Sequence, residues 1–445
     1  MGSYGSIGDA NGQIPKIIHA ATTDDALMAE KKYSARNYES LTTVFARAQG
    51  AYVWDPEGKQ YLDFNGASTA LIHGHCHPKL VAAFVEQASR LTLTSRAFHN
   101  DVYPKFTEIM TRFFGYDRLL PATTGAESVE TAIKIARKWS YKVKGVPQGQ
   151  AIVLGVADNY HGRTVIRSKL ATTALSSSMR ARESYGPLDP TITPFIPGTN
   201  KPIVYNDKAI LREAFETAGY NLAGFIVEPI LGDAGVVVPD DDYLQEARAL
   251  CDKHNVLLIC DEIQTGIART GKLLGHYWSG IRPDLVILGK TMSGGLYPVS
   301  CVLGDNDVIL TIEPGTHGST FGGNPLGSAV VLCALRVLEE ENLAERAEHL
   351  GNILRQGLKE IQATTTIIET IRGRGLLNAF IIDQNKTCGH TGIELCELMT
   401  KKGLLLKSSP TGVIRISPPL IITDEDMERA LAIIKESIIE FTSSL

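Results

Sequence analysis

A single lysine follows an apolar run and precedes a glycine-rich stretch. Residues 283–300 read PDLVILGKTMSGGLYPVS, so Lys290 stands directly after a candidate strand. The triplet Gly-Lys-Thr also ends a phosphate-binding P-loop, but residues 283–285 supply no glycine where that loop requires its first one. Lys290 therefore either carries chemistry at the mouth of a sheet or is a capping residue that extends into solvent.

Two acidic residues end another apolar run in the same way. Asp261 and Glu262 close the stretch VLLICDE at 256–262. Open α/β sheets bind ligands at the carboxyl ends of their strands, so we expect Lys290 and Asp261 to lie together. A lysine that forms a Schiff base and an aspartate that keeps a pyridine nitrogen protonated are the groups that pyridoxal phosphate (PLP) requires. The pair therefore favours PLP chemistry.

A phosphate site is predicted where a helix begins. Thr124, Gly125 and Ala126 open the helical stretch in LPATTGAESVETAIKIARKW. Backbone N–H groups at a helix N-terminus hold a phosphate, and glycine lets it approach closely. The same residues would suit an ordinary capped helix. In combination with Lys290 and Asp261, the phosphate site is the favoured interpretation.

The middle of the chain alternates short apolar strands with helical stretches, which is typical of a mostly parallel sheet covered by helices. A hairpin is expected at 51–64, with its turn at Pro56-Glu57-Gly58. In the middle of the chain, strands are expected at 151–156, 222–230, 256–262, 284–289 and 299–304, and helices at 126–145 and 241–255. Near the C-terminus, two helical stretches (328–362 and 424–445) flank strands at 376–383 and 412–422.

These elements predict an α/β protein in which both chain ends contribute to a smaller α+β domain. We assign residues 1–32 to a flexible tail and 33–75 to the N-terminal segment of the small domain. Residues 76–325 would form the large cofactor-binding domain, and 326–445 the C-terminal small domain. The polar stretch 168–202 is too long for a simple connector, which is typical of a functional or disordered loop.

Composition indicates an enzyme-sized soluble protein. The 445 residues are 44% hydrophobic and 21% charged, with a formal net charge of -5, which leaves no electrostatic footprint for nucleic acid. The seven scattered cysteines are typical of reduced intracellular thiols. No apolar run reaches the ~18 residues of a membrane span, and no leader pattern is evident, so we expect a cytosolic location. Met1-Gly2 matches the myristoylation pattern only loosely.

A family resemblance is carried by motifs that recur in order from about Tyr33 to the C-terminus. The chain resembles the class III aminotransferases, which have the PLP-dependent transferase fold type I, and among them the ornithine aminotransferases most closely. The motifs are GHCHPK, TTGAESVETAIKIARKW, NYHGRT, VEPILGDAGVVVP, DEIQTGIARTGK, PDLVILGKTMSGGLYPVSCVLG and HGSTFGGNPLG.

The resemblance implies a role for each matching residue around PLP. Lys290 would form the Schiff base, and Asp261 would pair with the pyridine nitrogen. Gln264 would approach the cofactor hydroxyl, while Tyr160 would stack on the ring. Thr320 would reach the phosphate of the neighbouring subunit's cofactor, which implies a homodimer with shared active sites. The cofactor contacts implied within one chain are Gly125, Ala126, Tyr160, Glu228, Asp261, Gln264 and Lys290.

The resemblance also implies two carboxylate sites, because the amino donor and the 2-oxo acid present different ends to the cofactor. Tyr38 and Arg163 would hold the α-carboxylate of the donor. Arg415 would grip the α-carboxylate of 2-oxoglutarate, and Asp233 would mask Arg415 until it arrives. The masking residue is usually a glutamate, so the shorter aspartate is expected to make a longer and weaker ion pair.

A second departure concerns the donor pocket. Ser68 stands where the ornithine enzymes place a tyrosine, and the long stretch 168–202 brings Arg180, Arg182 and Glu183 near the expected entrance. Ornithine is the leading donor, but lysine, N-acetylornithine or a secondary-metabolite amine stays open. The sequence leaves two other classes open: a PLP aminomutase, and a cofactor-free binding protein on the same scaffold. Arg415 and Asp233 argue against the aminomutase, which has no external 2-oxo acid to bind.

The cluster HGHCHP, with His73, His75, Cys76 and His77, raises the alternative of a zinc site. Gly74 and Pro78 favour a tight turn instead, and in this family the segment is structural. We therefore expect no metal.

Overall fold

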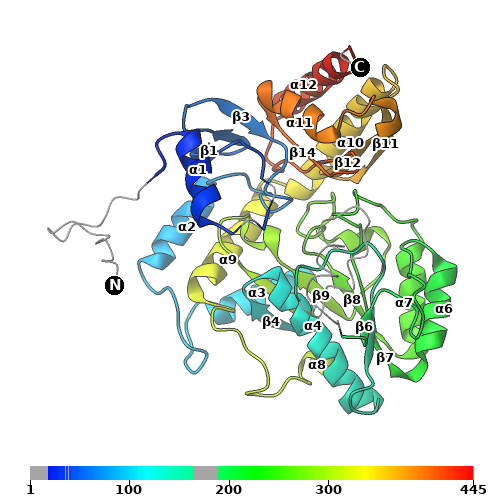
Figure 1. Ribbon diagram of the computed structural model, residues 1–445. Helices are drawn as coiled ribbons and strands as arrows, with labels where there is room; N and C mark the ends of the chain where they lie inside the picture. Colours follow the sequence, from blue (N-terminus) through cyan, green and yellow to red (C-terminus); the bar gives the residue numbers. More distant parts are fainter. Residues whose placement is uncertain (1–18, 36, 39, 165–188, 444–445) are drawn as a thin grey trace, which may run out of the picture.

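The computed structural model describes residues 19–35, 37, 38, 40–164 and 189–443, and it has a larger lower part and a smaller upper part (Figure 1). In the described residues the larger part is built on a seven-stranded sheet of order β4-β10-β9-β8-β7-β5-β6. Only β10 runs antiparallel to its neighbours. The strands are β4 Arg118–Ala122, β5 Ile152–Leu154, β6 Ile192–Thr193, β7 Leu222–Val227, β8 Leu257–Asp261, β9 Leu285–Leu288 and β10 Ser300–Gly304.

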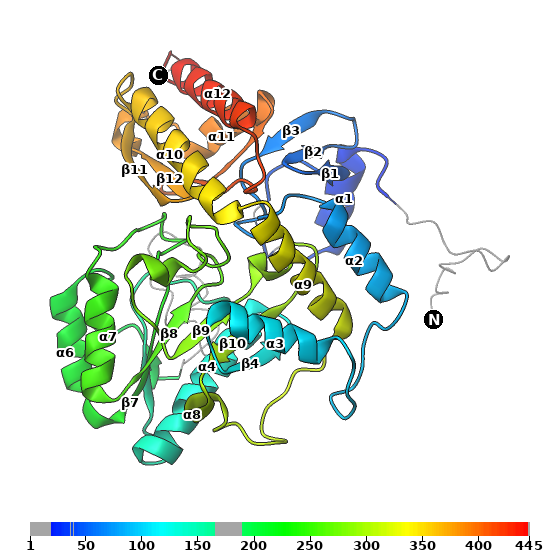
Figure 2. The same cartoon turned by 180° about the vertical axis from the view of Figure 1, so that it is seen from behind.

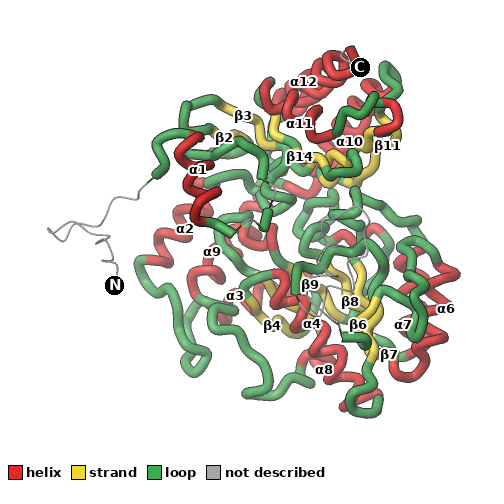
Figure 3. The backbone as a smooth tube through the Cα atoms, viewed as in Figure 1, coloured by secondary structure: helices red, strands yellow, loops and turns green. Residues whose placement is uncertain are grey.

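Helices cover both faces of this sheet. Successive side chains of a strand point to opposite faces, so neighbouring residues pack against different layers of helices. In β8, Leu258 packs in the cluster that contains α6 and α7, while Ile259 packs against α4 on the other face. Figure 3 shows these strands in the interior with helices outside them. The helices are α2 Pro78–Ala88, α3 Tyr103–Phe114, α4 Gly125–Trp139, α6 Lys208–Ala218, α7 Tyr243–His254, α8 Asn306–Ile309 and α9 Pro325–Glu340, and the π-helical turn η1 Ser140–Lys144 continues α4.

The two ends of the chain meet in the smaller part. Leu404 of β13 pairs in parallel with Leu62 of β3, so a C-terminal segment completes the N-terminal sheet of order β1-β2-β3-β13. A second sheet, of order β11-β12-β15-β14, lies against α10, α11 and α12 (Figure 1). The elements are β1 Arg47–Gln49, β2 Tyr52–Trp54, β3 Gln60–Asp63, α10 Leu343–Gln362, β11 Ile368–Arg374, β12 Leu377–Ile382, α11 Gly392–Lys401, β13 Leu404–Leu405, β14 Lys407–Ser408, β15 Val413–Ile416 and α12 Asp424–Ser443.

Short helical turns connect these elements at several places. Among them is η4, which contains Lys290. The short turns are η2 Gly219–Asn221, η3 Gly275–Trp278, η4 Lys290–Ser293 and η5 Gln384–Lys386. All seven cysteines are free thiols. Among the described helices, none combines the length and apolar content needed to cross a membrane.

Part of the segment assigned to the N-terminal tail is helical: α1 spans Thr23–Tyr33. The side chain of Thr22 caps it by accepting a hydrogen bond from the N–H of Asp25, and Thr23 donates to the carboxylate of Glu57 from its N–H and hydroxyl at 2.8 and 2.6 Å. No residue of α1 is buried, so it lacks the apolar pattern that reveals most helices. Gly2 lies outside the described residues.

The boundary expected between 325 and 326 falls at the first residue of α9. This helix packs against α2, α3 and η4 of the larger part. The break comes at Asn342, which has a left-handed φ of 50° and precedes α10. Figure 2 shows α9 leading from the larger part toward α10.

Candidate active site

Lys290 is positioned by the strand end and by an unusual backbone. It follows β9 and begins η4 with a φ of 35°, in the left-handed region that non-glycine residues rarely adopt. A Cβ on Gly289 would lie 3.4 Å from Ile263 and 3.6 Å from the Cα of Gly125. The strand end therefore lies close to both the turn after β8 and the start of α4.

The surroundings of Lys290 favour its neutral form. Burial lowers the pKa of its amine below the usual value, and the Arg415 guanidinium lowers it further. The carboxylates of Asp233, Glu228 and Asp261 oppose this shift of the pKa. A neutral amine is a nucleophile, so this position suits covalent chemistry.

Asp261 and Glu262 are neighbours in sequence but have separate roles. Asp261 is buried at the end of β8, where its Oδ2 contacts Nδ1 of His161 at 2.6 Å and its Oδ1 accepts from the N–H of Ile263 at 3.1 Å. Glu262 points elsewhere, and its carboxylate accepts from Gly275, His276 and Thr265. Thus Asp261 serves the site, whereas Glu262 holds the following loop. The sequence interpretation had not singled out His161, although it stands in the NYHGRT motif.

Glu228 and Gln264 form a buried pair beside Asp261. Glu228 Oε2 accepts from the N–H of Tyr160 at 2.6 Å, and its Oε1 accepts from Nε2 of Gln264 at 3.1 Å. Burial, followed by the charge of Asp261, raises the pKa of Glu228 to about 8. Oε1 of Gln264 is buried and has no partner among the described residues. A bound group with a hydrogen-bond donor would satisfy it.

The start of α4 is a capped helix N-terminus with two backbone N–H groups left over. A capping box uses the carboxylate of Glu127, which accepts the N–H groups of Thr123 and Thr124 at 2.9 and 2.7 Å. This leaves the N–H groups of Gly125 and Ala126 without a partner in the described part of the chain. A Cβ at Gly125 would lie 2.8 Å from Ile263, so glycine is required by close approach.

Two buried hydroxyls beneath this loop were not predicted. Ser300 donates to the carbonyl of Thr124 at 2.7 Å, and Ser128 donates to the Ser300 hydroxyl at 2.8 Å. No sequence signal distinguishes these serines from others at the start of a strand or within a helix. They fix the carbonyl that precedes Gly125.

Arg415 and Asp233 form a direct ion pair from Nη1 to Oδ1, so the expected long, weak pair is wrong. The reason is backbone packing. The turn at 230–237 lies on the C-terminal sheet, where Val236 clusters with Val413 of β15, and a Cβ on Gly235 would lie 3.2 Å from Val413. This close approach compensates for the methylene that aspartate lacks.

Tyr38 and Arg163 lie next to each other. The guanidinium carbon of Arg163 lies 4.9 Å from the centroid of the Tyr38 ring, which is a cation–π distance. The Tyr38 side chain is 65% exposed. The two residues come from separate segments, so tertiary structure forms this pair. Arg180, Arg182 and Glu183 lie outside the described residues.

Ser68 lies in a turn that packs beneath the segment after Arg415. The Ser68 N–H donates to the carbonyl of Asn65 at 3.0 Å, and the hydroxyl of Ser417 donates to the same carbonyl at 2.9 Å. A Cβ on Gly66 would lie only 2.3 Å from the Ser417 carbonyl oxygen. The positions of Ser68 and Arg415 are therefore coupled through adjacent backbone.

Thr320 is exposed and lines a groove of about 620 Å³ together with Arg96, Tyr103 and His317. Its neighbour Ser319 donates to Glu127 at 3.2 Å, so the Thr320 loop lies beside the start of α4.

The histidines of the HGHCHP motif have separate contacts. Nε2 of His73 donates to the carbonyl of Ala334 at 2.9 Å, His75 contacts Asp63 at 2.8 Å, and His77 faces Glu341 at 3.4 Å. In the part of the chain that the structure describes, no group of three or more His, Cys, Asp or Glu residues has the arrangement of a metal site.

Comparison with known proteins identifies the family. The family Aminotransferase class-III matches residues 33–438. The chain belongs to the class III aminotransferases. The predicted fold class, an α/β protein of PLP-dependent transferase fold type I, is confirmed.

Individual relatives agree with this assignment. The chain is 62% identical over 440 residues to the ornithine aminotransferase of Emericella nidulans, covering 99% of this chain and 94% of the relative. A crystal structure of the ornithine aminotransferase from Toxoplasma gondii superposes with a TM-score of 0.89 at 42% identity, covering 95% of this chain and 96% of that one. The acetylornithine aminotransferase from Elizabethkingia anophelis has a TM-score of 0.81, also at 42% identity, with coverages of 94% and 99%.

Proposed function

We propose that this protein is a PLP-dependent ω-aminotransferase that moves the terminal amino group of ornithine to 2-oxoglutarate, giving glutamate and a semialdehyde that can cyclise. The observation that carries the proposal is the ion pair between Arg415 and Asp233, whose charges both act on Lys290. An arginine that is masked and can be released suits an enzyme whose two substrates present different ends. The identity to the Emericella nidulans ornithine aminotransferase also supports it.

PLP fits the residues present. The neighbouring strand ends supply an amine with a lowered pKa, at Lys290, and the buried carboxylate of Asp261. The backbone N–H groups of Gly125 and Ala126 would bind a phosphate. The buried Oε1 of Gln264 has no hydrogen-bond partner among the described residues and would accept a hydrogen bond from the cofactor. A second structure of the Toxoplasma gondii relative has PLP at partial occupancy in its active site. When bound, PLP supplies an electron sink for charge that develops on the substrate carbon.

The side chains of this protein would then orient the substrates and move protons. Asp261 would hold a proton on the pyridine nitrogen, and His161 would orient Asp261 by donating from Nδ1. Nζ of Lys290 would accept a proton from the substrate carbon as a general base and would later donate it as a general acid. Glu228 accepts hydrogen bonds from Gln264 and from the N–H of Tyr160; in this way it would hold Gln264 at the cofactor hydroxyl and the Tyr160 ring against the cofactor.

The carboxylate-binding groups would act in turn. In the donor half-reaction Arg163 and Tyr38 would hold the α-carboxylate of ornithine, so that the terminal amine points toward Lys290. Asp233 would keep Arg415 from that carboxylate. When 2-oxoglutarate arrives, Asp233 would release Arg415, which would bind the α-carboxylate through two parallel hydrogen bonds.

We propose a homodimer in which Thr320 contacts the phosphate bound by the neighbouring subunit. This proposal rests on the exposure of Thr320, its place in a groove and its closeness to α4. Mixing the Lys290→Ala and Thr320→Ala variants should form hybrid dimers. In each hybrid, one active site would carry both substitutions and the other would carry neither, so activity should be recovered. A monomer in sedimentation that still turns over would exclude the idea.

The cytosolic location stays a prediction, which a fluorescent fusion of the full chain would check.

N-acetylornithine and lysine are the second candidates for the donor. They are favoured by Ser68, which stands where the ornithine enzymes have a tyrosine, and by the similarity to an acetylornithine aminotransferase. An aminomutase is less well supported because the Arg415–Asp233 pair has no role without an external 2-oxo acid.

A donor screen tests the proposal. Purified protein is incubated with 2-oxoglutarate and with ornithine, N-acetylornithine or lysine, and glutamate is measured. We expect ornithine to have the highest kcat/KM. Turnover of ornithine without 2-oxoglutarate would favour the aminomutase, and the absence of a visible absorption band would favour the binding protein.

A further inference from the structure

Arg269 is a fully buried arginine whose partners among the described residues are backbone carbonyls. Its side chain is 0% exposed. Nη1 donates to the carbonyls of Leu376 and Pro418 at 3.2 and 2.6 Å, and Nη2 donates to the carbonyl of Thr69 at 3.1 Å. Burial alone lowers the pKa of this guanidinium to about 9. Burying a charge without an opposite charge is costly, so the contacts it makes must matter to the fold or to the site.

The three carbonyls belong to segments that carry the predicted substrate contacts. Thr69 follows Ser68 in the donor-pocket turn, and Pro418 follows β15, which carries Arg415. Leu376 precedes β12, which pairs with β15. Arg269 itself lies on the loop that begins with Asp261 and Gln264. One guanidinium therefore joins the cofactor side of the site to the Ser68 turn and to the end of the Arg415 strand.

The donor-pocket turn needs such an anchor because its backbone is strained. Gly66, Ala67, Ser68 and Thr69 have φ values of 52°, 49°, 56° and 81°. Glycine adopts this region readily, but the other three residues do so only when the surrounding structure holds them there. Oδ1 of Asp63 accepts the N–H groups of Asn65 and Gly66 at one end of the turn. Arg269 holds the other end through Thr69.

We propose that Arg269 is a positioning residue for substrate binding: it fixes the Ser68 turn and the end of the Arg415 strand relative to the Asp261–Gln264 turn. The wall of the donor pocket at Ser68 and the 2-oxoglutarate carboxylate site at Arg415 would then lie at the correct distance from Lys290. The part of this inference that concerns substrates rests on the proposed function. The part that concerns the turn rests on the contacts alone.

The test uses the full-length holoenzyme with Arg269→Met and Arg269→Lys. In Arg269→Met we expect amide hydrogen exchange to become faster at 66–70 and 416–420. We expect kcat/KM for ornithine and for 2-oxoglutarate to fall on the order of tenfold or more, mainly through KM, as for other displaced positioning groups. The absorption spectrum should stay close to wild type. Arg269→Lys should recover part of both effects, since an ammonium can reach some of the carbonyls.

Arg282→Lys is the matched control, because Arg282 lies at the opposite edge of the central sheet and also donates to a backbone carbonyl, that of Gly115. It should leave both KM values and exchange at 66–70 unchanged. If Arg269→Met fails to fold, Ser417→Ala removes a different anchor of the same turn and should give a smaller effect of the same sign.

The proposal is overturned if the Arg269 variants lower only the unfolding midpoint and leave exchange at the turn and both KM values unchanged. Wild-type protein that does not use ornithine would contradict the proposed function instead. In that case the exchange measurement still decides whether Arg269 anchors the turn.

Discussion

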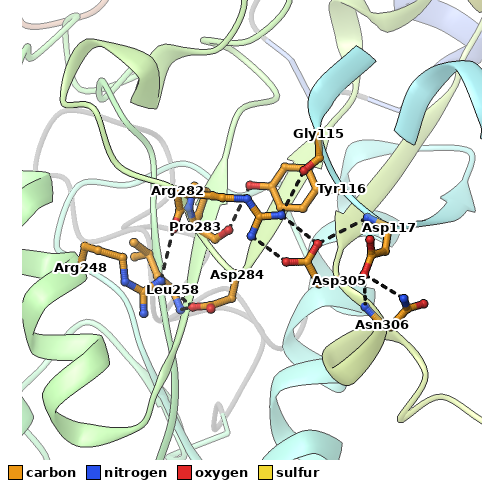
Figure 4. Close-up of polar contacts among 10 residues, drawn as sticks. All are labelled: Gly115, Tyr116, Asp117, Arg248, Leu258, Arg282, Pro283, Asp284, Asp305 and Asn306. Carbon is orange, nitrogen blue, oxygen red and sulfur yellow. Dashed lines mark hydrogen bonds and ion pairs between the residues drawn. The ribbon is translucent and has the colours of Figure 1, made fainter. Parts of the chain in front are cut away.

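Two pairs of ionisable groups, one at each edge of the central sheet, differ in the protonation state that the structure favours. At the carboxyl edge, burial lowers the pKa of Lys290 and raises that of Glu228 to about 8, so both groups shift toward their neutral forms. At the amino edge, Arg282 donates to both oxygens of Asp305 at 2.6 and 2.8 Å, which raises the pKa of Arg282 and lowers that of Asp305 (Figure 4).

The amino edge is built for pairing. Arg282 also stacks on the ring of Tyr116 at 4.4 Å, and Arg248 donates to Asp284 at 2.7 Å while Asp284 accepts the N–H of Leu258 (Figure 4). Each charge there has a partner that stabilises its ionised form. At the carboxyl edge, by contrast, burial moves the pKa of Lys290 and Glu228 toward their neutral forms, although Arg415 and Asp233 form an ion pair there. The Arg282–Asp305 pair is thus shifted toward its ionised forms, whereas Lys290 and Glu228 are shifted toward their neutral forms.

The largest expected effect comes from Lys290→Ala. Because the proposed mechanism uses Nζ both to bind the cofactor and to move a proton, kcat should fall on the order of 10⁴-fold or more. The unfolding midpoint should stay close to wild type, since Lys290 forms no ion pair with any residue that the structure describes. Steady-state transamination and calorimetry check this. A variant that keeps its normal rate would show that this edge is not the reactive one.

Donor choice should respond to Ser68 and much less to Asp233. Ser68→Tyr adds an aromatic wall and should shift kcat/KM toward ornithine over lysine by about 1–3 kcal/mol. Asp233→Glu should have a small effect, because Asp233 already contacts Arg415 directly. The two single variants and the double variant are compared with ornithine, lysine and N-acetylornithine. No shift in any of them would move donor control away from these positions.

The raised pKa of Glu228 predicts a pH dependence of stability. The folded state binds a proton more tightly than the unfolded state, whose glutamate has an ordinary pKa near 4.3. The stabilisation relative to high pH is therefore complete below about pH 4 and is lost as pH rises toward 8. Glu228→Gln should become more stable relative to wild type between pH 5 and 8. Urea unfolding at several pH values measures this; parallel curves for the two proteins would contradict it.

The smallest expected effect is at the amino edge. Arg282→Ala should lower the free energy of unfolding by about 1 kcal/mol, because a partly exposed ion pair and a cation–π contact contribute modestly. Transamination kinetics should not change. A loss of activity comparable to that of a carboxyl-edge variant would remove the distinction between the two edges.

The sequence by itself determined most of the large sheet and the cofactor side of the site. The apolar runs predicted β5, β7, β8, β9 and β10, because strands buried on both faces are continuously apolar. Local motifs predicted Lys290, Asp261 and Gly125, because each depends on its own strand end or helix start. Because each of these residues stands at the end of one strand or the start of one helix, the local sequence is enough to place it.

Tertiary structure decided what depends on distance between separate segments. The reach of Asp233 to Arg415 follows from the packing of Val236 on Val413, and no property of an aspartate predicts it. Arg269 resembles any other arginine in sequence, and only the folded chain brings three carbonyls to it. Helix α1 has no buried face, so its caps alone define it. Side-chain chemistry is local to the sequence, whereas the geometry that joins two side chains is set by the backbone packing between them.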